Sequence, residues 1–251
     1  MTVVAVAMCK DEADVIAYTI THLLAEGVDH IIVADNLSTD DTRQILDLYA
    51  ESYPVTVVDD PDPGYRQDVK MTNLARLAAA EFAADWVLPF DADEVFYDPD
   101  RTLAEFFERC EADVVTVTGW DYVATDADDP TVDNPFARIT HRRQSPQKFG
   151  KVAFRPHHDA RLDYGNHFLF DHPGPAVRAL RLAHFQYRSF EQMVTKVRQG
   201  SAACAAAGLS PTHSAHWREL DALDDEGIWG QWRTRCEELG LVFDPAPWRS
   251  L

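Results

Sequence analysis

Four short apolar runs in the first 90 residues constrain the fold of this chain more than any other feature. The runs are Val3–Cys9, His30–Ala34, Val55–Val58 and Trp86–Phe90. Continuous apolar runs of this length are typical of strands that are covered on both faces. We therefore predict four buried strands in one sheet.

Helical patterns fill the stretches between these strands. An apolar stripe predicts a helix from Asp11 to about Glu26, and Gly27 follows at its end. Ser38 and Asp41 have the spacing of a capping box, with Ser38 as the N-cap of a second helix, and a third helix is expected over residues 72–84. Strands joined by helices imply right-handed crossovers and a mainly parallel sheet with helices on both faces.

The charged loops after the four strands should meet at one edge of this sheet. They span residues 10–14, 35–41, 59–70 and 91–94. Ligands of parallel α/β sheets bind beyond the carboxyl ends of the strands, where such loops lie. The sequence thus predicts an α/β fold with a charged site at that edge.

The last of these loops is Asp91-Ala92-Asp93-Glu94, three carboxylates in four residues. Alternate side chains of an extended segment share a face, so Asp91 and Asp93 can converge. Two close carboxylates favour a divalent cation bound through oxygen, which we expect to be Mn²⁺ or Mg²⁺. Because such sites leave ligand positions open for phosphates, a nucleoside diphosphate substrate is the leading hypothesis.

An excess of negative charge strengthens the case for a cation. The 251 residues include 23 Lys and Arg against 42 Asp and Glu, a formal net charge of −19. This charge disfavours non-specific binding to nucleic acid or to an anionic membrane. A phosphate-bearing ligand therefore needs a metal ion or a few placed cations, for which Arg66, Lys70, Arg188 and Lys196 are candidates.

The remaining composition indicates a soluble cytoplasmic protein. The four cysteines are far apart and form no Cys-x-x-Cys pair, so we expect free thiols. The apolar run at the amino terminus has no basic region before it and predicts a strand, not a signal peptide. No apolar stretch approaches the roughly 20 residues that a transmembrane helix needs.

The second half of the chain is less regular. Thr102 and Glu105 form a capping box before a helix to about residue 112, and Ser189 opens a long helix to about residue 207. Residues 121–163 are polar and broken by prolines, as is typical of functional loops. The tryptophans after residue 213 are expected to pack helical segments against the core.

Three motifs, in this order and strand context, resemble those of a family 2 glycosyltransferase with the GT-A fold. They are residues 7–12 (Ala-Met-Cys-Lys-Asp-Glu), 33–42 (Val-Ala-Asp-Asn-Leu-Ser-Thr-Asp-Asp-Thr) and 91–94. The run His-Phe-Gln-Tyr-Arg-Ser at 184–189 matches the branch with an Asp-x-Asp-Glu motif. The resemblance implies a single GT-A domain over residues 1–251. Residues 1–100 would bind the nucleotide sugar, and residues 101–251, with the C-terminal helices, would bind the acceptor.

The resemblance also implies a metal site. Asp93 would bind the ion directly, and Asp91 would contact the ribose or reach the metal through water. His184 would add a ligand from the second half of the chain. The ion would stabilise the charge that develops on the departing diphosphate.

For the donor, the resemblance assigns Glu12 and Asp35 to hydrogen bonds with the nucleoside, and Cys9 lies in the same matched motif. Many relatives have two acidic residues where this chain has Asp35-Asn36. The resemblance alone therefore does not assign which of the two residues contacts the base. Arg188 falls in the matched run of the second half. The favoured donor is a uridine diphosphate sugar, transferred with inversion to a small-molecule, glycan or lipid acceptor.

The base that activates the acceptor has three candidates. Asp163 and His167 lie in the segment 161–167, and Glu94 adjoins the metal motif. In the resembled branch a Gly-x-His, here Gly165 to His167, stands near the acceptor side. The three alternatives stay open.

Two other functions deserve comparison. A sugar-nucleotide nucleotidyltransferase also uses an acidic magnesium site, but it should carry a Gly-rich phosphate loop after the first strand, and residues 9–12 contain no glycine. A non-catalytic relative that only binds a sugar nucleotide would not need Asp91, Asp93 and His184 intact. The spacing of His157, His158 and Asp159 fits no familiar ligand pattern and predicts a polar loop.

Overall fold

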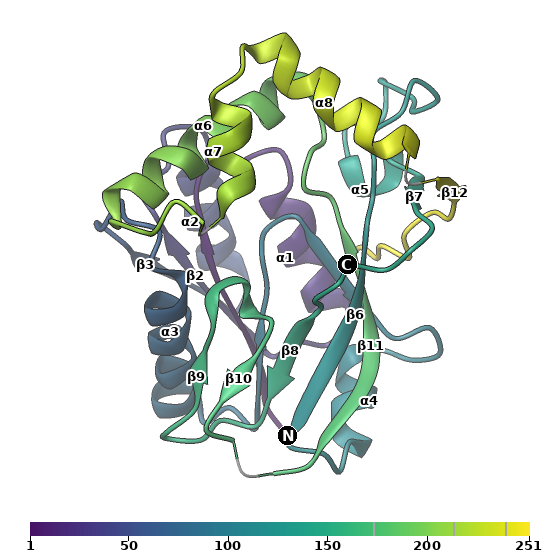
Figure 1. Cartoon of the computed structure of the whole chain (residues 1–251). Helices are drawn as coiled ribbons and strands as arrows, with labels where there is room; N and C mark the ends of the chain where they lie inside the picture. Colours follow the sequence, from purple (N-terminus) through teal and green to yellow (C-terminus); the bar gives the residue numbers. More distant parts are fainter. Residues whose placement is uncertain (173, 213, 239) are drawn as a thin grey trace.

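A mixed eight-stranded sheet forms the centre of the computed structural model, which describes residues 1–172, 174–212, 214–238 and 240–251 (Figure 1). In order across the sheet its strands are β3 (Val55–Asp59), β2 (His30–Asp35), β1 (Val3–Cys9), β4 (Trp86–Pro89), β8 (Lys151–Phe154), β6 (Val114–Asp121), β11 (Ala176–His184) and β5 (Glu94–Tyr97). The first four run parallel. Beyond them β8 is antiparallel to β4 and β6, β11 is parallel to β6, and β5 is antiparallel to β11.

Helices cover both faces of this sheet because alternate residues of the buried strands point to opposite sides. Val3, Ala5 and Ala7 of β1 belong to the same core cluster as buried residues of α1 (Ile16–Ala25), α2 (Thr42–Ser52) and α4 (Leu103–Arg109). Val4 and Val6 belong instead to the cluster that contains α3 (Gln67–Phe82). The predicted α/β class, with helices on both faces, is confirmed, and the parallel arrangement holds for the first half of the chain.

The second half adds short elements around the sheet. They are α5 (Pro135–Arg138), the pair β7 (His141–Arg143) and β12 (Leu241–Phe243), the pair β9 (Arg161–Leu162) and β10 (Leu169–Phe170), the single turn η1 (Tyr164–Asn166), and the helices α6 (Phe190–Ala206), α7 (Ala215–Asp221) and α8 (Asp225–Glu238). Helices α6, α7 and α8 lie together at the top of Figure 1. Trp217, Trp229 and Trp232 pack there against a separate small core and not against the main core as expected, whereas Trp248 does pack against the main core.

The C-terminal tail returns to the first half of the chain. The Trp248 indole donates to the Tyr18 carbonyl at 3.1 Å, and the Arg249 amide donates to His22 Nδ1 at 3.0 Å. The Arg249 side chain also lies 3.0 Å from the Glu26 carboxylate. The C-terminal tail therefore helps to hold α1 in place.

Several helix boundaries differ from the sequence-based expectations. The capping box at Ser38 is wrong, because α2 begins at Thr42 and the Ser38 hydroxyl accepts the Asp11 amide at 3.1 Å. Helix α1 begins at Ile16 rather than near Asp11, and α3 begins at Gln67, five residues before the expected start. The capping box at Thr102 and the Ser189 cap are confirmed.

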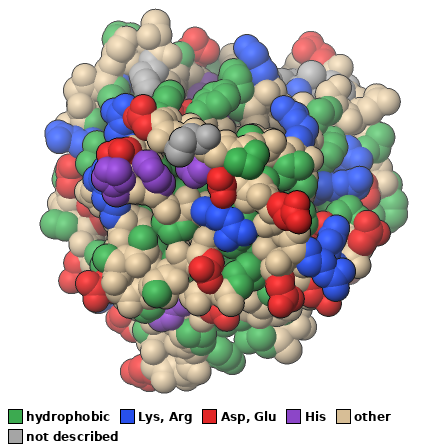
Figure 2. Space-filling view, turned by 90° about the horizontal axis from the view of Figure 1, so that it is seen from below, with side chains coloured by type: hydrophobic (Ala, Val, Ile, Leu, Met, Phe, Trp, Pro, Cys, Tyr) green, Lys and Arg blue, Asp and Glu red, His purple; other side chains and the backbone are tan. Residues whose placement is uncertain are grey.

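The surface carries charges of both signs. Figure 2 shows the face seen from below, where acidic and basic side chains are interspersed and several histidines gather. Cys9, Cys110 and Cys204 have free thiols, and the fourth cysteine, Cys236, lies outside the described side chains. Among the described residues, no helix combines the length and the apolar character that crossing a membrane requires.

Candidate active site

A cavity of about 640 Å³ opens at the carboxyl edge of the parallel strands. Its lining includes the loop after β1, the acidic turn between β4 and β5, the start of β8, the end of β11 and one side of α6. Residues from both halves of the sequence therefore share one cleft, at the edge where the charged loops were expected.

Asp91 and Glu94 are paired with a buried lysine. Lys151 Nζ lies 2.5 Å from Asp91 Oδ2 and 3.1 Å from Glu94 Oε1, and Lys151 itself is only 5% exposed. The Asp91 amide also donates to Glu94 Oε2 at 2.9 Å, which fixes the turn. Burial raises the pKa of Glu94 to about 7, reinforced by Asp91 and opposed by Lys151.

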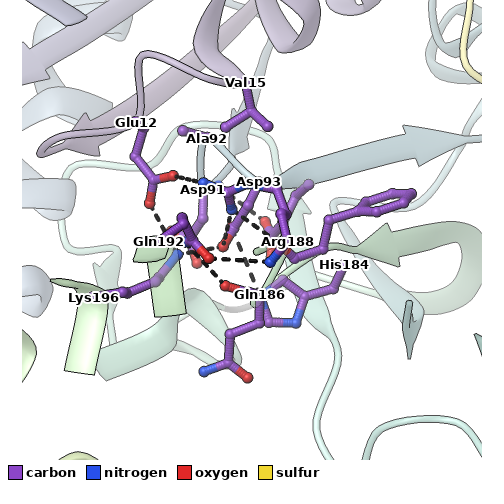
Figure 3. Close-up of polar contacts among 12 residues, drawn as sticks. Glu12, Val15, Asp91, Ala92, Asp93, His184, Gln186, Arg188, Gln192 and Lys196 are labelled. Carbon is purple, nitrogen blue, oxygen red and sulfur yellow. Dashed lines mark hydrogen bonds and ion pairs between the residues drawn. The ribbon is translucent and has the colours of Figure 1, made fainter. Parts of the chain in front are cut away.

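Asp93, like Glu94, is only 1% exposed, and Figure 3 shows the residues around it. Its Oδ2 accepts a hydrogen bond from Lys196 Nζ and lies 3.6 Å from Arg188 Nη1. Burial alone would raise the pKa of Asp93, but Lys196, His184 and Arg188 outweigh it and hold the pKa well below its usual range. Asp93 is therefore ionised.

His184 faces Asp93 from the end of β11. Its Nε2 is 3.7 Å from Asp93 Oδ1, and its Nδ1 lies 3.1 Å from Asp121 Oδ1. Gln147 donates to the same Asp121 oxygen at 2.6 Å, and so fixes the carboxylate that orients the imidazole. Burial lowers the pKa of His184, but Asp93 and Asp121 outweigh it and raise the pKa to about 9.

This donor set fits a divalent cation at Asp93 and His184. A histidine that ligates a metal usually donates its other ring N–H to a carboxylate, which is the role available to Asp121. The distance of 3.7 Å between Asp93 Oδ1 and His184 Nε2 is too long for a direct hydrogen bond. Both atoms can therefore bind the same ion. Asp91 fits less well as a direct ligand, because Lys151 binds one of its oxygens and Gln67 lies 3.3 Å from the other.

A buried arginine ties the acidic turn to the loop after β1. Arg188 Nη2 lies 2.6 Å from Glu12 Oε2, and Nε lies 2.7 Å from Asp14 Oδ2. Lys196 reaches Glu12 as well, at 2.9 Å from its Oε1 (Figure 3). Glu12 and Asp93 thus share two cations.

The sequence matches the profile described as "Glycosyl transferase family 2" over residues 4–163. The chain belongs to this family. The match confirms the resemblance, and the cavity is the candidate active site. None of the curated proteins matches the chain.

Solved structures with a similar fold include TarS of S. aureus. TarS 1–349 in complex with UDP is 14% identical, with a TM-score of 0.45 over 79% of this chain and 65% of that one. TarS 1–349 in complex with UDP-GlcNAc is 16% identical, with a TM-score of 0.44 over 85% of this chain and 69% of that one. For 4-diphosphocytidyl-2C-methyl-D-erythritol synthase the identity is 14% and the TM-score 0.37, over 61% and 75% of the two chains. The chain thus spans less than two thirds of TarS 1–349 in its complex with UDP, and 40% of the chain in another TarS structure.

Most of the predicted site residues share the cavity. Its lining includes Cys9, Glu12, Asp91, Asp93, Glu94, His167 and His184. Five other predicted residues are not among the described residues that line it: Asp35, Arg66, Lys70, Asp163 and Arg188.

Each of these five residues has another partner. Asp35 is buried and lies 3.4 Å from the Ser38 amide, while its neighbour Asn36 lines the cavity. Arg66 is 3.6 Å from the Asp62 carboxylate, and Lys70 lies 2.6 Å from the Asp60 carboxylate. Arg188 pairs with Glu12 and Asp93, and Asp163 accepts two backbone amides of its own turn.

The three candidate bases differ in geometry. Asp163 Oδ1 accepts the backbone amides of His167 and Phe168 at 2.7 and 2.8 Å, so it holds the turn. His167 lines the cavity, and its Nδ1 lies 2.6 Å from the Gly150 carbonyl, which makes Nδ1 the protonated nitrogen and leaves Nε2 free to accept a proton. Burial and Lys151 lower the pKa of His167, which favours the neutral imidazole.

Sequence reasoning missed three residues of this site. Lys151 and Asp121 approach the acidic turn through β8 and β6, far from it in sequence, and a lone lysine at the head of a buried strand was the available signal. Trp217 lines the cavity opposite Gly200 of α6, where a Cβ would come within 2.4 Å of the indole. The missing side chain of Gly200 therefore makes room for the Trp217 indole at the cavity wall.

Proposed function

We propose that this transferase moves a sugar from a nucleoside diphosphate donor to a hydroxyl acceptor, with a divalent cation bound at Asp93 and His184. The observation that carries the proposal is the buried Asp93–His184–Asp121 arrangement at the floor of the cavity. A uridine diphosphate sugar is the favoured donor, with its nucleoside beside Glu12 and the loop after β1.

The residues of the cavity divide the work of the reaction. A bound Mn²⁺ or Mg²⁺ would stabilise negative charge on the departing diphosphate. Lys196 lies next to Asp93 and Glu12 and supplies a further positive charge for the phosphates. Arg188 holds both carboxylates in place from behind.

His167 is the proposed general base. Its Nδ1–H donates to the Gly150 carbonyl, which fixes the tautomer in which Nε2 accepts a proton. The acceptor hydroxyl transfers its proton to Nε2 as its oxygen attacks the anomeric carbon. Attack opposite the diphosphate inverts that carbon. Glu94 is the rival base, but both Lys151 and the Asp91 amide already engage its carboxylate.

A thermal-shift panel of uridine, guanosine and thymidine diphosphates, each with and without Mn²⁺, tests this proposal. We expect the largest rise in melting temperature for uridine diphosphate together with Mn²⁺, since its phosphates would complete the coordination shell of the ion. Asp93→Asn should abolish both the Mn²⁺-dependent part of the shift and sugar transfer.

Asp126→Asn is a matched control for this variant. Asp126 belongs to a second Asp-Ala-Asp sequence, its side chain is 88% exposed, and it pairs with Arg233 away from the cavity. This control should keep full activity. Normal transfer by Asp93→Asn would overturn the proposed function.

A further inference from the structure

Three half-exposed phenylalanines form an apolar stripe next to the cavity. Phe149, Phe168 and Phe170 are 45%, 50% and 49% exposed. The rings of Phe149 and Phe168 meet edge to face, with their centroids 5.7 Å apart. Phe168 and Phe170 alternate with Leu169, which packs against the core, so their side chains share the outer side of β10.

This exposure is unusual within the chain. Among the described residues, Phe243 on β12 is the one other phenylalanine exposed by more than a third. A phenylalanine left in water loses part of the favourable free energy that burial of its ring would give. Apolar groups gathered at the rim of a polar cavity are typical of a binding surface.

The stripe is continuous with the candidate base. Phe149 itself lines the cavity, and its ring centroid lies 5.8 Å from that of His167. Both residues belong to segments of the second half, the loop before β8 and the turn before β10, and not to the loops after β1 and β2 where the nucleoside is expected. The apolar stripe therefore extends from the acceptor side of the site.

We propose that the acceptor carries an apolar group, an aryl ring or an alkyl chain, which packs on Phe149 and Phe168 while its hydroxyl approaches His167. This inference rests on the proposed function, because it assigns the stripe to that reaction's second substrate. The net charge of −19 disfavours an anionic bilayer as the occupant, so we assign the stripe to the apolar part of a single acceptor molecule.

The test compares apolar groups on a constant sugar. Binding of octyl, 4-nitrophenyl and methyl β-D-glucopyranoside is measured by ligand-detected NMR below the micellar concentration of the octyl compound, with UDP and Mn²⁺ present. We expect the octyl and aryl glucosides to bind at least about tenfold more tightly than the methyl glucoside, as burial of several methylenes or a ring implies. Equal binding of the three glucosides would overturn the proposal.

Matched variants locate the contact. Phe149→Ser and Phe168→Ser should remove the preference for the apolar glucosides, and Phe149→Leu should retain most of it. Phe243→Ser, on β12, is the control and should bind like the wild type. The assignment would be contradicted if both Phe149→Ser and Phe168→Ser kept the preference for the apolar glucosides. It would also be contradicted if sedimentation showed a dimer of the wild type that these two variants dissociate.

The UDP-dependent thermal shift, recorded in the same samples, separates this inference from the proposed function. Absence of that shift in the wild-type protein would count against the donor site. An intact shift without any preference for the octyl or aryl glucoside would refute the acceptor proposal alone. A preference for the apolar glucosides without UDP binding would support the stripe and leave the donor assignment refuted.

Discussion

Replacing Lys196 by methionine should weaken the metal-free protein and tighten its binding of Mn²⁺. Lys196 Nζ contacts Asp93 Oδ2 and lies 2.9 Å from Glu12 Oε1, with 21% of its side chain exposed. Removing one partner of a buried ion pair costs about 3–5 kcal/mol, because the other charge stays buried. Arg188 Nη1, 3.6 Å from the same Asp93 oxygen, keeps part of the compensation. We therefore expect a loss near the lower end, about 3 kcal/mol.

Two measurable changes follow from the removal of the Lys196 charge. A destabilisation of about 3 kcal/mol lowers the melting temperature of a chain of this size by roughly 6–12 °C. Lys196 and a metal ion that share the Asp93 carboxylate also repel each other, by about 4 kcal/mol per pair of unit charges at 4 Å and intermediate dielectric. The variant should accordingly bind Mn²⁺ at least about tenfold more tightly in the absence of nucleotide, and UDP more weakly.

Thermal melting and calorimetric titration of Mn²⁺ check both changes. Arg233→Met is a control away from the cavity, since Arg233 pairs with the exposed Asp126 carboxylate and its replacement should cost less than about 1 kcal/mol. The reasoning is refuted by a Lys196→Met variant that melts like the wild type and binds Mn²⁺ no more tightly.

Two further predictions concern groups behind the site. Burial and the nearby Arg249 lower the pKa of His22 to about 4, against a backbone hydrogen bond to Phe96 that raises it. The folded protein therefore excludes a proton that the unfolded chain takes up near pH 6.5, so the stabilisation is complete above that pH and falls by up to about 3 kcal/mol towards pH 4. We expect the free energy of urea unfolding to fall more steeply between pH 6.5 and pH 4 in the wild type than in His22→Gln. Parallel pH profiles of the two proteins would contradict this. Arg188→Lys keeps the charge but loses the two bonds to Asp14, so UDP should bind about tenfold more weakly in calorimetry, whereas unchanged affinity would remove the positioning role of Arg188.

The sequence was sufficient to predict the parts of the fold that depend on local pattern. The four parallel strands end in charged loops, and the acidic turn and His184 line one cavity, because parallel strands bring their carboxyl ends to one edge. The Thr102 cap was predictable because both members of its capping box lie within four residues.

Contacts between distant segments were not predictable in this way. Ser38 has the sequence of a helix cap, but its hydroxyl accepts a hydrogen bond from the Asp11 amide. This bond joins the loop after β2 to the loop after β1. Lys151 contacts Asp91 because β8 lies antiparallel beside β4. The hydrophobic pattern of the sequence does not predict which strands pair in this way. Such residues complete the charge balance of the site, so a motif alone gives its acids and not their partners.

The central claim is that Asp93 and His184 hold a divalent cation that binds the diphosphate of the donor. Pulsed electron paramagnetic resonance of Mn²⁺ in the presence of UDP tests it directly, because an imidazole nitrogen bound to Mn²⁺ gives a ¹⁴N modulation. The control is His158→Gln, since His157, His158 and Asp159 form the one group of at least three close His, Cys, Asp or Glu ligand atoms among the described residues, on a largely exposed loop. We predict a ¹⁴N signal in the wild type and in His158→Gln that is lost in His184→Gln. A wild-type spectrum without that signal, or one lost only in His158→Gln, would contradict the account.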